Sequence, residues 1–170
     1  MFYPDLEPVR SEFSIYPKVL NIGWLDNGYT YYKGLMNTSL VTKLKEIILL
    51  DLDQMPDDEF CGIQHHPKNI IVHRMHMMGE PFRCPFCKSK VSLHDDSGRE
   101  MILGKNEVII PSVNRDYVFC FPTLVYHYVT KHNYLPPEVF LKALAYFSLD
   151  KPYNYLEDPS IFDVKKLISM

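Results

Sequence analysis

Apolar residues at helical spacing predict three helices in this chain. The first covers residues 40–48 and follows Asn37, whose side chain suits the N-cap position. The second covers residues 122–132, and Asn133 provides a left-handed stop. The third runs from Pro136 to Phe147. The apolar positions on these three faces are Leu40, Leu44, Ile47, Ile48, Leu124, Val125, Tyr128, Val129, Phe140, Ala143, Leu144 and Phe147.

Runs of β-forming residues around turn signals predict hairpins. Residues 19–25 and 29–32 flank Asn27-Gly28, a dipeptide that favours the tight turn of a two-residue hairpin. Turn residues at 95–98 and 114–116 lie between further strand-like runs and predict two more hairpins. Together with the helices, these elements indicate a mixed α and β fold.

Candidate chemistry is concentrated in two pairs of residues. Cys84 and Cys87 form a C-x2-C pair, and His127 and His132 follow on the second predicted helix, beginning forty residues after Cys87. Thiolate sulfur and imidazole nitrogen are ligands that zinc prefers, and both spacings occur in Cys2His2 sites. The interval between the pairs is longer than in a DNA-reading finger. The sequence therefore predicts one zinc ion held by these four residues.

Alternatives to this ligand set stay open at the level of sequence. A C-x2-C pair is also typical of redox enzymes, but there it opens a helix, whereas residues 88–90 lead here into a strand-like run. Residues five apart point away from each other on an ideal helix, so we expect His132 where the last turn loosens. Cys61 is an alternative ligand, and Cys120, within an apolar run, is expected to be a small buried hydrophobe.

Length and composition indicate one domain with a hydrophobic core, since 170 residues suffice to bury one. We expect an N-terminal hairpin and helix in residues 1–60, a zinc module in 61–147 and a tail in 148–170. The module would contain a Cys-x-x-Cys knuckle, a hairpin and a ligand-bearing helix in that order. The predicted fold class is α+β, a single domain with β-hairpins and a treble-clef-like zinc module.

Several separated segments resemble landmarks of a family of small, uncharacterised bacterial zinc-binding proteins. These segments are Tyr3-Pro4-Asp5-Leu6, Gly23-Trp24-Leu25-Asp26, the Cys84 to Cys87 pair and a run from Pro122 to Phe140 that includes His127-Tyr128-Val129, His132, Tyr134 and Pro136-Pro137. The resemblance implies a metal role for the two cysteines and two histidines, and it places the N-terminal segments in the same domain. The family has a histidine where this chain has Phe82, so a fifth candidate ligand is missing here. The family brings no established activity.

An acidic stretch follows the first predicted helix, without a compensating basic residue. Its acidic residues are Asp51, Asp53, Asp57, Asp58 and Glu59. Such a stretch is usually a solvated loop, and it also suits a contact with a basic protein partner. Both interpretations remain open.

Four more histidines precede the knuckle, namely His65, His66, His73 and His76. Histidine is the commonest metal ligand, so these residues, with Glu80 as a general base, form the basis of a hydrolase hypothesis. In a strand over residues 70–78, however, side chains alternate between faces, and His73 and His76 do not share one. The alternation favours structural or surface roles for them.

The charges of the chain bear on whether it binds nucleic acid or membranes. A formal net charge of −3 gives no long-range attraction to nucleic acid. A local basic cluster around the knuckle, with Arg74, Arg83, Lys88 and Lys90, nevertheless keeps nucleic-acid binding as an alternative. The chain has no apolar run of about 20 residues and no signal-peptide layout, so we expect a cytoplasmic protein without membrane contact.

The leading functional hypothesis is a non-catalytic, zinc-stabilised protein-interaction module. Its most concrete form is a bacterial toxin-immunity or inhibitor protein. Four protein ligands close the coordination sphere of zinc, whereas a catalytic zinc keeps one position for water. A zinc-containing nucleic-acid-binding protein is the first alternative and a zinc-dependent hydrolase the second. The sequence gives no indication of the oligomeric state.

Overall fold

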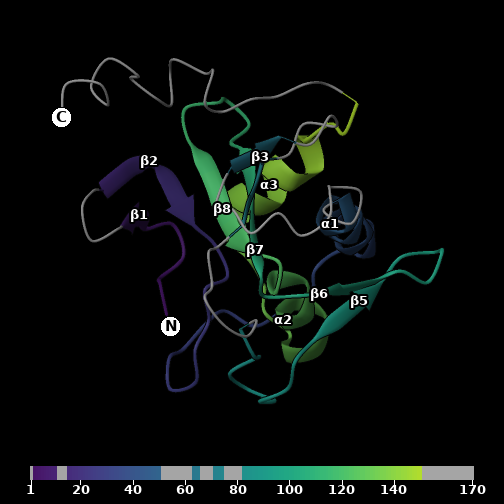
Figure 1. The fold of residues 1–170 in the computed structure, drawn as a ribbon. Helices are drawn as coiled ribbons and strands as arrows, with labels where there is room; N and C mark the ends of the chain where they lie inside the picture. The colour runs from purple at the N-terminus through teal and green to yellow at the C-terminus, as the bar shows by residue number, and fades with distance from the viewer. Residues whose placement is uncertain (1, 11–14, 51–62, 66–70, 75–81, 151–170) are drawn as a thin grey trace.

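The computed structural model describes residues 2–10, 15–50, 63–65, 71–74 and 82–150 of the chain (Figure 1). Within these ranges it contains a six-stranded sheet, a two-stranded sheet and three helices, so the fold is of the mixed α+β class. No helix in the described part of the chain combines the length and the apolar character needed to cross a bilayer.

The large sheet has the strand order β1-β2-β8-β7-β4-β3. In that order the strands are β1 (Pro8–Arg10), β2 (Ile15–Asn21), β8 (Val118–Pro122), β7 (Asn106–Pro111), β4 (Ile71–Arg74) and β3 (Ile63–His65). Neighbouring strands are antiparallel except for β2 and β8, which are parallel. The hairpin β7–β8 confirms the turn predicted at 114–116, where the Ser112 hydroxyl accepts hydrogen bonds from the Asp116 and Tyr117 N–H groups.

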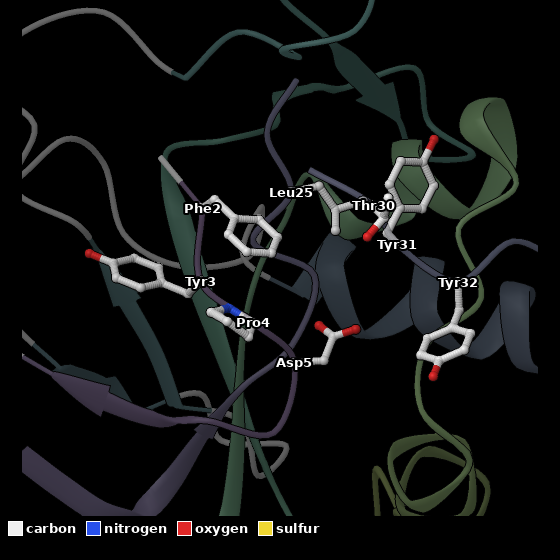
Figure 2. Close-up of a pocket in the computed structure, with 8 residues that line it drawn as sticks. All are labelled: Phe2, Tyr3, Pro4, Asp5, Leu25, Thr30, Tyr31 and Tyr32. Atoms are coloured by element: carbon white, nitrogen blue, oxygen red, sulfur yellow. The ribbon is translucent and has the colours of Figure 1, made fainter. Parts of the chain in front are cut away.

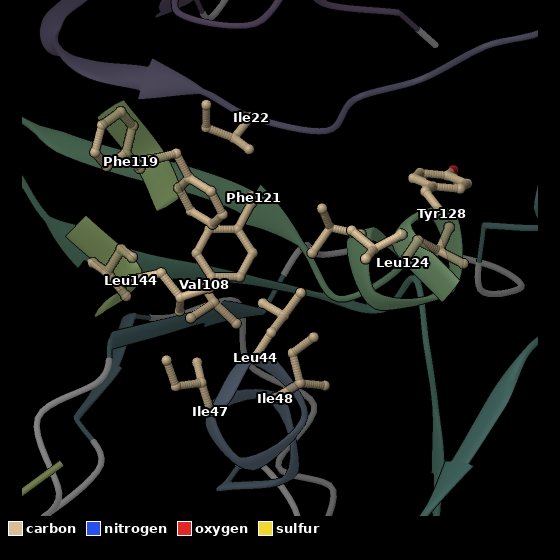
Figure 3. Close-up of a cluster of buried hydrophobic side chains, with 14 of the residues drawn as sticks. Ile22, Leu44, Ile47, Ile48, Val108, Phe119, Phe121, Leu124, Tyr128 and Leu144 are labelled. Carbon is tan, nitrogen blue, oxygen red and sulfur yellow. The ribbon is translucent and has the colours of Figure 1, made fainter. Parts of the chain in front are cut away.

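The core lies where the sheet meets α1 (Thr38–Leu49) and α3 (Glu138–Tyr146), as Figure 3 shows. Every residue of β8 is buried, and Phe119 and Phe121 pack edge-on against Phe140 of α3, with ring centroids 5.5 and 5.2 Å apart. Fully burying a side chain of this size contributes roughly 1.5–3 kcal/mol. The apolar faces predicted for the first and third helices are confirmed.

Polar contacts cap the start of helix α1 and connect its middle to α3. The Asn37 side chain accepts a hydrogen bond from the Ser39 N–H at 2.9 Å and so satisfies one of the open donors of the first turn. Lys43 donates to the Ala145 carbonyl at 2.8 Å, near the end of α3, where the carbonyl groups of a helix carry partial negative charge. The contact of Lys43 joins the two helices, which pack against each other beside the sheet.

The small sheet is the second hairpin that the sequence predicts. Strands β5 (Ser92–His94) and β6 (Glu100–Ile102) are antiparallel and are joined by a turn that Asp95 organises. The Asp95 carboxylate accepts hydrogen bonds from the Ser97 N–H and the Arg99 N–H, both at 2.9 Å. Hydrogen bonds from Ser97 and Arg99 hold the pKa of Asp95 well below its ordinary value.

The prediction of a hairpin over residues 19–32 is wrong. The turn is present, with Gly28 at positive φ and the Tyr29 N–H facing the Asp26 carbonyl, but no ladder follows it. Strand β2 pairs instead with β1 on one side and β8 on the other, so both of its edges are occupied. The chain after the turn runs to residues 133–135, where Lys33 bridges Tyr134.

At Gly23 the segment after β2 passes close to α2 (Val125–His132). Its φ is +69°, and a Cβ at this position would lie 2.7 Å from the Val125 Cγ2. Gly98 also has positive φ, +85°, but a Cβ there would meet nothing within 4 Å. Only glycine adopts such angles without a steric penalty. Substituting Gly23 and Gly98 in turn therefore separates the cost of backbone strain, which both positions carry, from the cost of crowding, which arises at Gly23.

We predict that Gly23→Ala lowers the free energy of unfolding by about 2–4 kcal/mol, from left-handed strain plus overpacking. The matched change Gly98→Ala is expected to cost only about 1–2 kcal/mol, because it carries the strain alone. Urea unfolding of both variants measures the difference. Equal losses would show that the contact with Val125 imposes no constraint.

Candidate metal centre

The first half of the candidate site is a tight turn after residue 82. The Cys84 carbonyl accepts a hydrogen bond from the Lys88 N–H at 2.8 Å, and the Cys84 N–H donates to the Ser89 carbonyl at 3.1 Å. Lys88 takes a left-handed conformation, with φ of 57°. This knuckle places both thiols on the same side of the turn; Cys84 is buried and Cys87 is exposed.

The second half is the helix α2, which carries both histidines. His127 lies in its first turn and His132 is its last residue. At the end of the helix the Tyr128 carbonyl accepts from the N–H groups of Asn133 and Tyr134, five and six residues later, and Asn133 is left-handed. The last turn is therefore wider than an α-turn, which confirms the loosening that the five-residue spacing requires.

The four side chains converge on a common centre. Their ligand atoms all lie within 4.8 Å of one another. The Sγ of Cys84 lies 3.2 Å from the His132 Nε2, the Sγ of Cys87 lies 3.3 Å from the His127 Nε2, and the two Nε2 atoms are 3.1 Å apart. A tetrahedral zinc site has edges of about 3.3 Å between nitrogens and about 3.5 Å between nitrogen and sulfur. The observed distances are a few tenths of an ångström shorter, so the residues could hold a metal ion.

Protonation in the free cluster differs from residue to residue. Burial lowers the pKa of His127 and of His132, which favours the neutral imidazole that binds metals. Burial raises the pKa of the Cys84 thiol, whereas a hydrogen bond with the Ser89 hydroxyl lowers the pKa of Cys87. A bound cation would deprotonate both thiols.

Phe86, inside the knuckle, anchors the two halves to each other. Its ring lies 4.9 Å from the His132 ring, 5.8 Å from the Tyr128 ring and 5.4 Å from the Tyr31 ring. The Tyr31 hydroxyl in turn donates to the His132 carbonyl at 3.3 Å. These aromatic contacts fix the knuckle against α2 before any metal is considered, and they bring residues 29–35 to the same place.

A second contact fixes the end of α2 to residues 2–7, which precede β1 and are called here the N-terminal arm. The Tyr134 hydroxyl donates to the Asp5 carboxylate at 2.7 Å, and the Gly23 N–H donates to the same carboxylate at 2.8 Å. Tyr134 is fully buried. Asp5, Gly23 and Tyr134 belong to three of the segments that carry the family resemblance, and here those segments meet two residues after His132.

The comparisons with known proteins agree with an origin in an uncharacterised family. The model of a domain of unknown function, DUF7919, matches residues 1–145. The chain belongs to this family. All four candidate ligands and the three residues of the Asp5 contact lie within the matched range. Searches against curated proteins and against solved structures gave no match.

The structure brings together the four predicted ligands, and of the other candidate ligands it describes the side chain of Cys120 alone. Cys120 is buried in β8, as expected of a small hydrophobe, and lies outside the cluster. Outside the described residues lie the acidic residues Asp51, Asp53, Asp57, Asp58 and Glu59, the alternative ligand Cys61, and His66, His76 and Glu80. Of His65 and His73 the backbone is described, on the paired strands β3 and β4.

Sequence reasoning missed the residues that support the ligands. Tyr31 and Phe86 contact His132, and Asp5 reaches Tyr134 across the fold. The landmark segments were the one sequence signal for these supporting residues. They include Asp5 and Tyr134, but the sequence does not show that the two side chains are in contact.

We predict that Tyr134→Phe lowers the free energy of unfolding by about 1–3 kcal/mol, because it leaves the partly buried Asp5 carboxylate with one donor fewer. Tyr146→Phe is the matched control, since Tyr146 is 76% exposed. Combining Tyr134→Phe with Asp5→Asn should recover about 1 kcal/mol relative to additivity. Purely additive losses in denaturant unfolding would argue against the contact.

Proposed function

We propose that the four ligands bind a single structural zinc ion and that the protein is a non-catalytic, zinc-stabilised interaction module. Its most concrete form is a bacterial toxin-immunity or inhibitor protein. The observation that carries the structural role is the convergence of two sulfur and two nitrogen donors within 4.8 Å. Such a set favours zinc over harder cations and leaves no coordination position for a catalytic water.

The surroundings of the cluster support the proposal. Within the described residues, the group that could hold a metal contains no carboxylate. The order of knuckle, hairpin β5–β6 and ligand-bearing helix supports a treble-clef-like module, with the hairpin β7–β8 of the large sheet inserted before the helix. A metal role for a pair of cysteines such as Cys84 and Cys87 is typical of a reducing compartment, which supports a cytoplasmic location.

The partner surface that we propose is the loop of residues 29–35, called here the tyrosine loop. It displays Tyr29, Tyr32 and Leu35, which are 56%, 80% and 89% exposed. Exposed aromatic and large apolar side chains grouped in one place are typical of protein-binding surfaces.

The metal centre supports this loop through backbone contacts. The Gly34 N–H donates to the Asn133 carbonyl at 2.9 Å, and the Leu135 N–H donates to the Tyr32 carbonyl at 3.0 Å. Both contacts lie within three residues of His132, so a metal that fixes the end of α2 would also fix the displayed side chains.

One observation favours the nucleic-acid alternative. Lys33, Lys88 and Lys131 are exposed around the cluster. Burial is the main cause that lowers the pKa of both histidines; the charge of Lys33 adds to the effect on His132, and the charge of Lys131 adds to the effect on His127. A basic rim beside an exposed tyrosine is the arrangement with which single strands are bound without sequence preference.

We predict one zinc per chain in the purified protein. Cys84→Ser combined with Cys87→Ser should remove it, while Cys120→Ala, which changes a buried thiol outside the cluster, should leave it in place. Chelation should lower the unfolding temperature, but by less than in a finger peptide, where zinc supplies roughly 10 kcal/mol or more of the folding free energy. Metal analysis by mass spectrometry measures the content; full zinc occupancy in the double variant would refute the assignment.

We predict that Tyr32→Ala with Leu35→Ala abolishes capture of the native partner from the host, without shifting the unfolding temperature, since both side chains are exposed. Val139→Ala, a change at an exposed apolar residue of α3, is the matched control. The readout is the protein recovered in stoichiometric amount. Salt-sensitive binding of oligonucleotides that is lost with Lys33→Gln and Lys131→Gln would instead favour the nucleic-acid alternative.

A further inference from the structure

A cavity of about 480 Å³ lies between the N-terminal arm and the tyrosine loop (Figure 2). Its lining includes Phe2, Tyr3, Asp5, Leu25, Tyr31 and Tyr32. Four of these six side chains are aromatic, and one carries a formal charge. The remaining lining residues are Pro4 and Thr30, so hydroxyl groups and one carboxylate accompany the rings. A concave site of this size, with aromatic walls and a few polar groups, is the usual form of a small-molecule site.

The carboxylate of Asp5 is the charged group among the side chains that line this cavity. It accepts hydrogen bonds from the Gly23 N–H and the Tyr134 hydroxyl, which use two of its roughly four acceptor positions. Within the described residues, no lysine or arginine forms an ion pair with it. Burial is the main cause that raises the pKa of Asp5, so its negative charge is incompletely compensated by the protein. A cation entering the cavity would supply the missing charge.

The aromatic walls suit the same kind of ligand. The ring of Tyr31 already lies 5.4 Å from the Nζ of Lys33, a cation–π distance, although Lys33 does not line the cavity. Phe2 stacks on Tyr29 with ring centroids 4.1 Å apart and an interplanar angle of 8°, so the wall contributed by the arm is supported from behind. Figure 2 shows the Asp5 carboxylate between the ring of Phe2 and the segment that carries Tyr31 and Tyr32.

We propose that this cavity binds an organic ammonium ion, with the charge paired to the Asp5 carboxylate and the alkyl groups packed against Tyr31 and Tyr32. The chemistry is shared by free quaternary or primary amines and by the side chain of a lysine on another protein. The cavity is a separate site from the candidate metal centre, because none of the four metal-ligand candidates lines it.

The first test compares choline with 3,3-dimethylbutan-1-ol, which has the same shape without the charge. Titrations followed by calorimetry and by NMR shifts should show choline binding at least about tenfold more tightly, the ratio expected from an ion pair and a cation–π contact. Equal affinities, or binding of neither compound at millimolar concentration, would overturn the proposal.

Variants then locate the site. Asp5→Asn keeps an acceptor for the Gly23 N–H but removes the charge, and it should weaken choline binding about tenfold or more. Tyr32→Ala is expected to weaken it about two- to tenfold with the fold intact, since this side chain is 80% exposed. Tyr146→Ala, at an exposed tyrosine of α3, should change it less than twofold. If Asp5→Asn fails to fold, Tyr32→Ala decides, and unchanged affinity there would refute the site.

A final comparison identifies the source of the cation. A short peptide with one central lysine is titrated against the same peptide with norleucine in that position. Tighter binding of the lysine peptide than of choline would assign the cavity to a protein side chain, and the reverse order would assign it to a free amine. Lys33→Gln should leave choline binding equal or tighter, because it removes a nearby like charge; a loss of binding would contradict the arrangement.

Discussion

The approach of four donor atoms to within 4.8 Å of one another is the constraint on which the rest of the fold depends. Neutral imidazole nitrogens and thiolate sulfurs each direct a lone pair toward the common centre, and such groups repel one another unless a proton or a cation lies between them. Two nitrogens at 3.1 Å, each about as far from a sulfur, therefore form an arrangement that a divalent cation stabilises. Two local features of the backbone produce this arrangement of donor atoms, namely the widened last turn of α2 and the left-handed conformation of Lys88.

Short chains of contacts connect the four-residue cluster to the surface of the protein. From His132, the Tyr31 hydroxyl leads to the tyrosine loop, and Tyr134 leads to Asp5 and the N-terminal arm. The cavity between arm and loop is bounded by both of these connections, although the metal ligands do not line it. Partner binding at the loop and ligand binding in the cavity would therefore act on neighbouring parts of one scaffold, with the metal centre as its fixed end.

The sequence predicted those parts of the fold that local signals determine. Helix α1 follows from its cap at Asn37 and its apolar face. The four residues that converge were singled out because zinc prefers their side chains as ligands. The hairpin at residues 19–32 failed because the turn chemistry of Asn27-Gly28 is local, whereas the pairing of β2 with β1 and β8 is decided by strands far away in the chain. The cavity was equally out of reach, since Asp5 and Tyr31 meet there only through the tertiary fold.

The central claim is that the cluster is a closed, structural zinc site, and X-ray absorption at the zinc edge of the purified protein tests it most directly. The account predicts two sulfur neighbours at about 2.3 Å and two imidazole nitrogens at about 2.0 Å, with no further ligand. One sulfur, or one imidazole with an oxygen in the remaining position, would show an open site and would contradict the account.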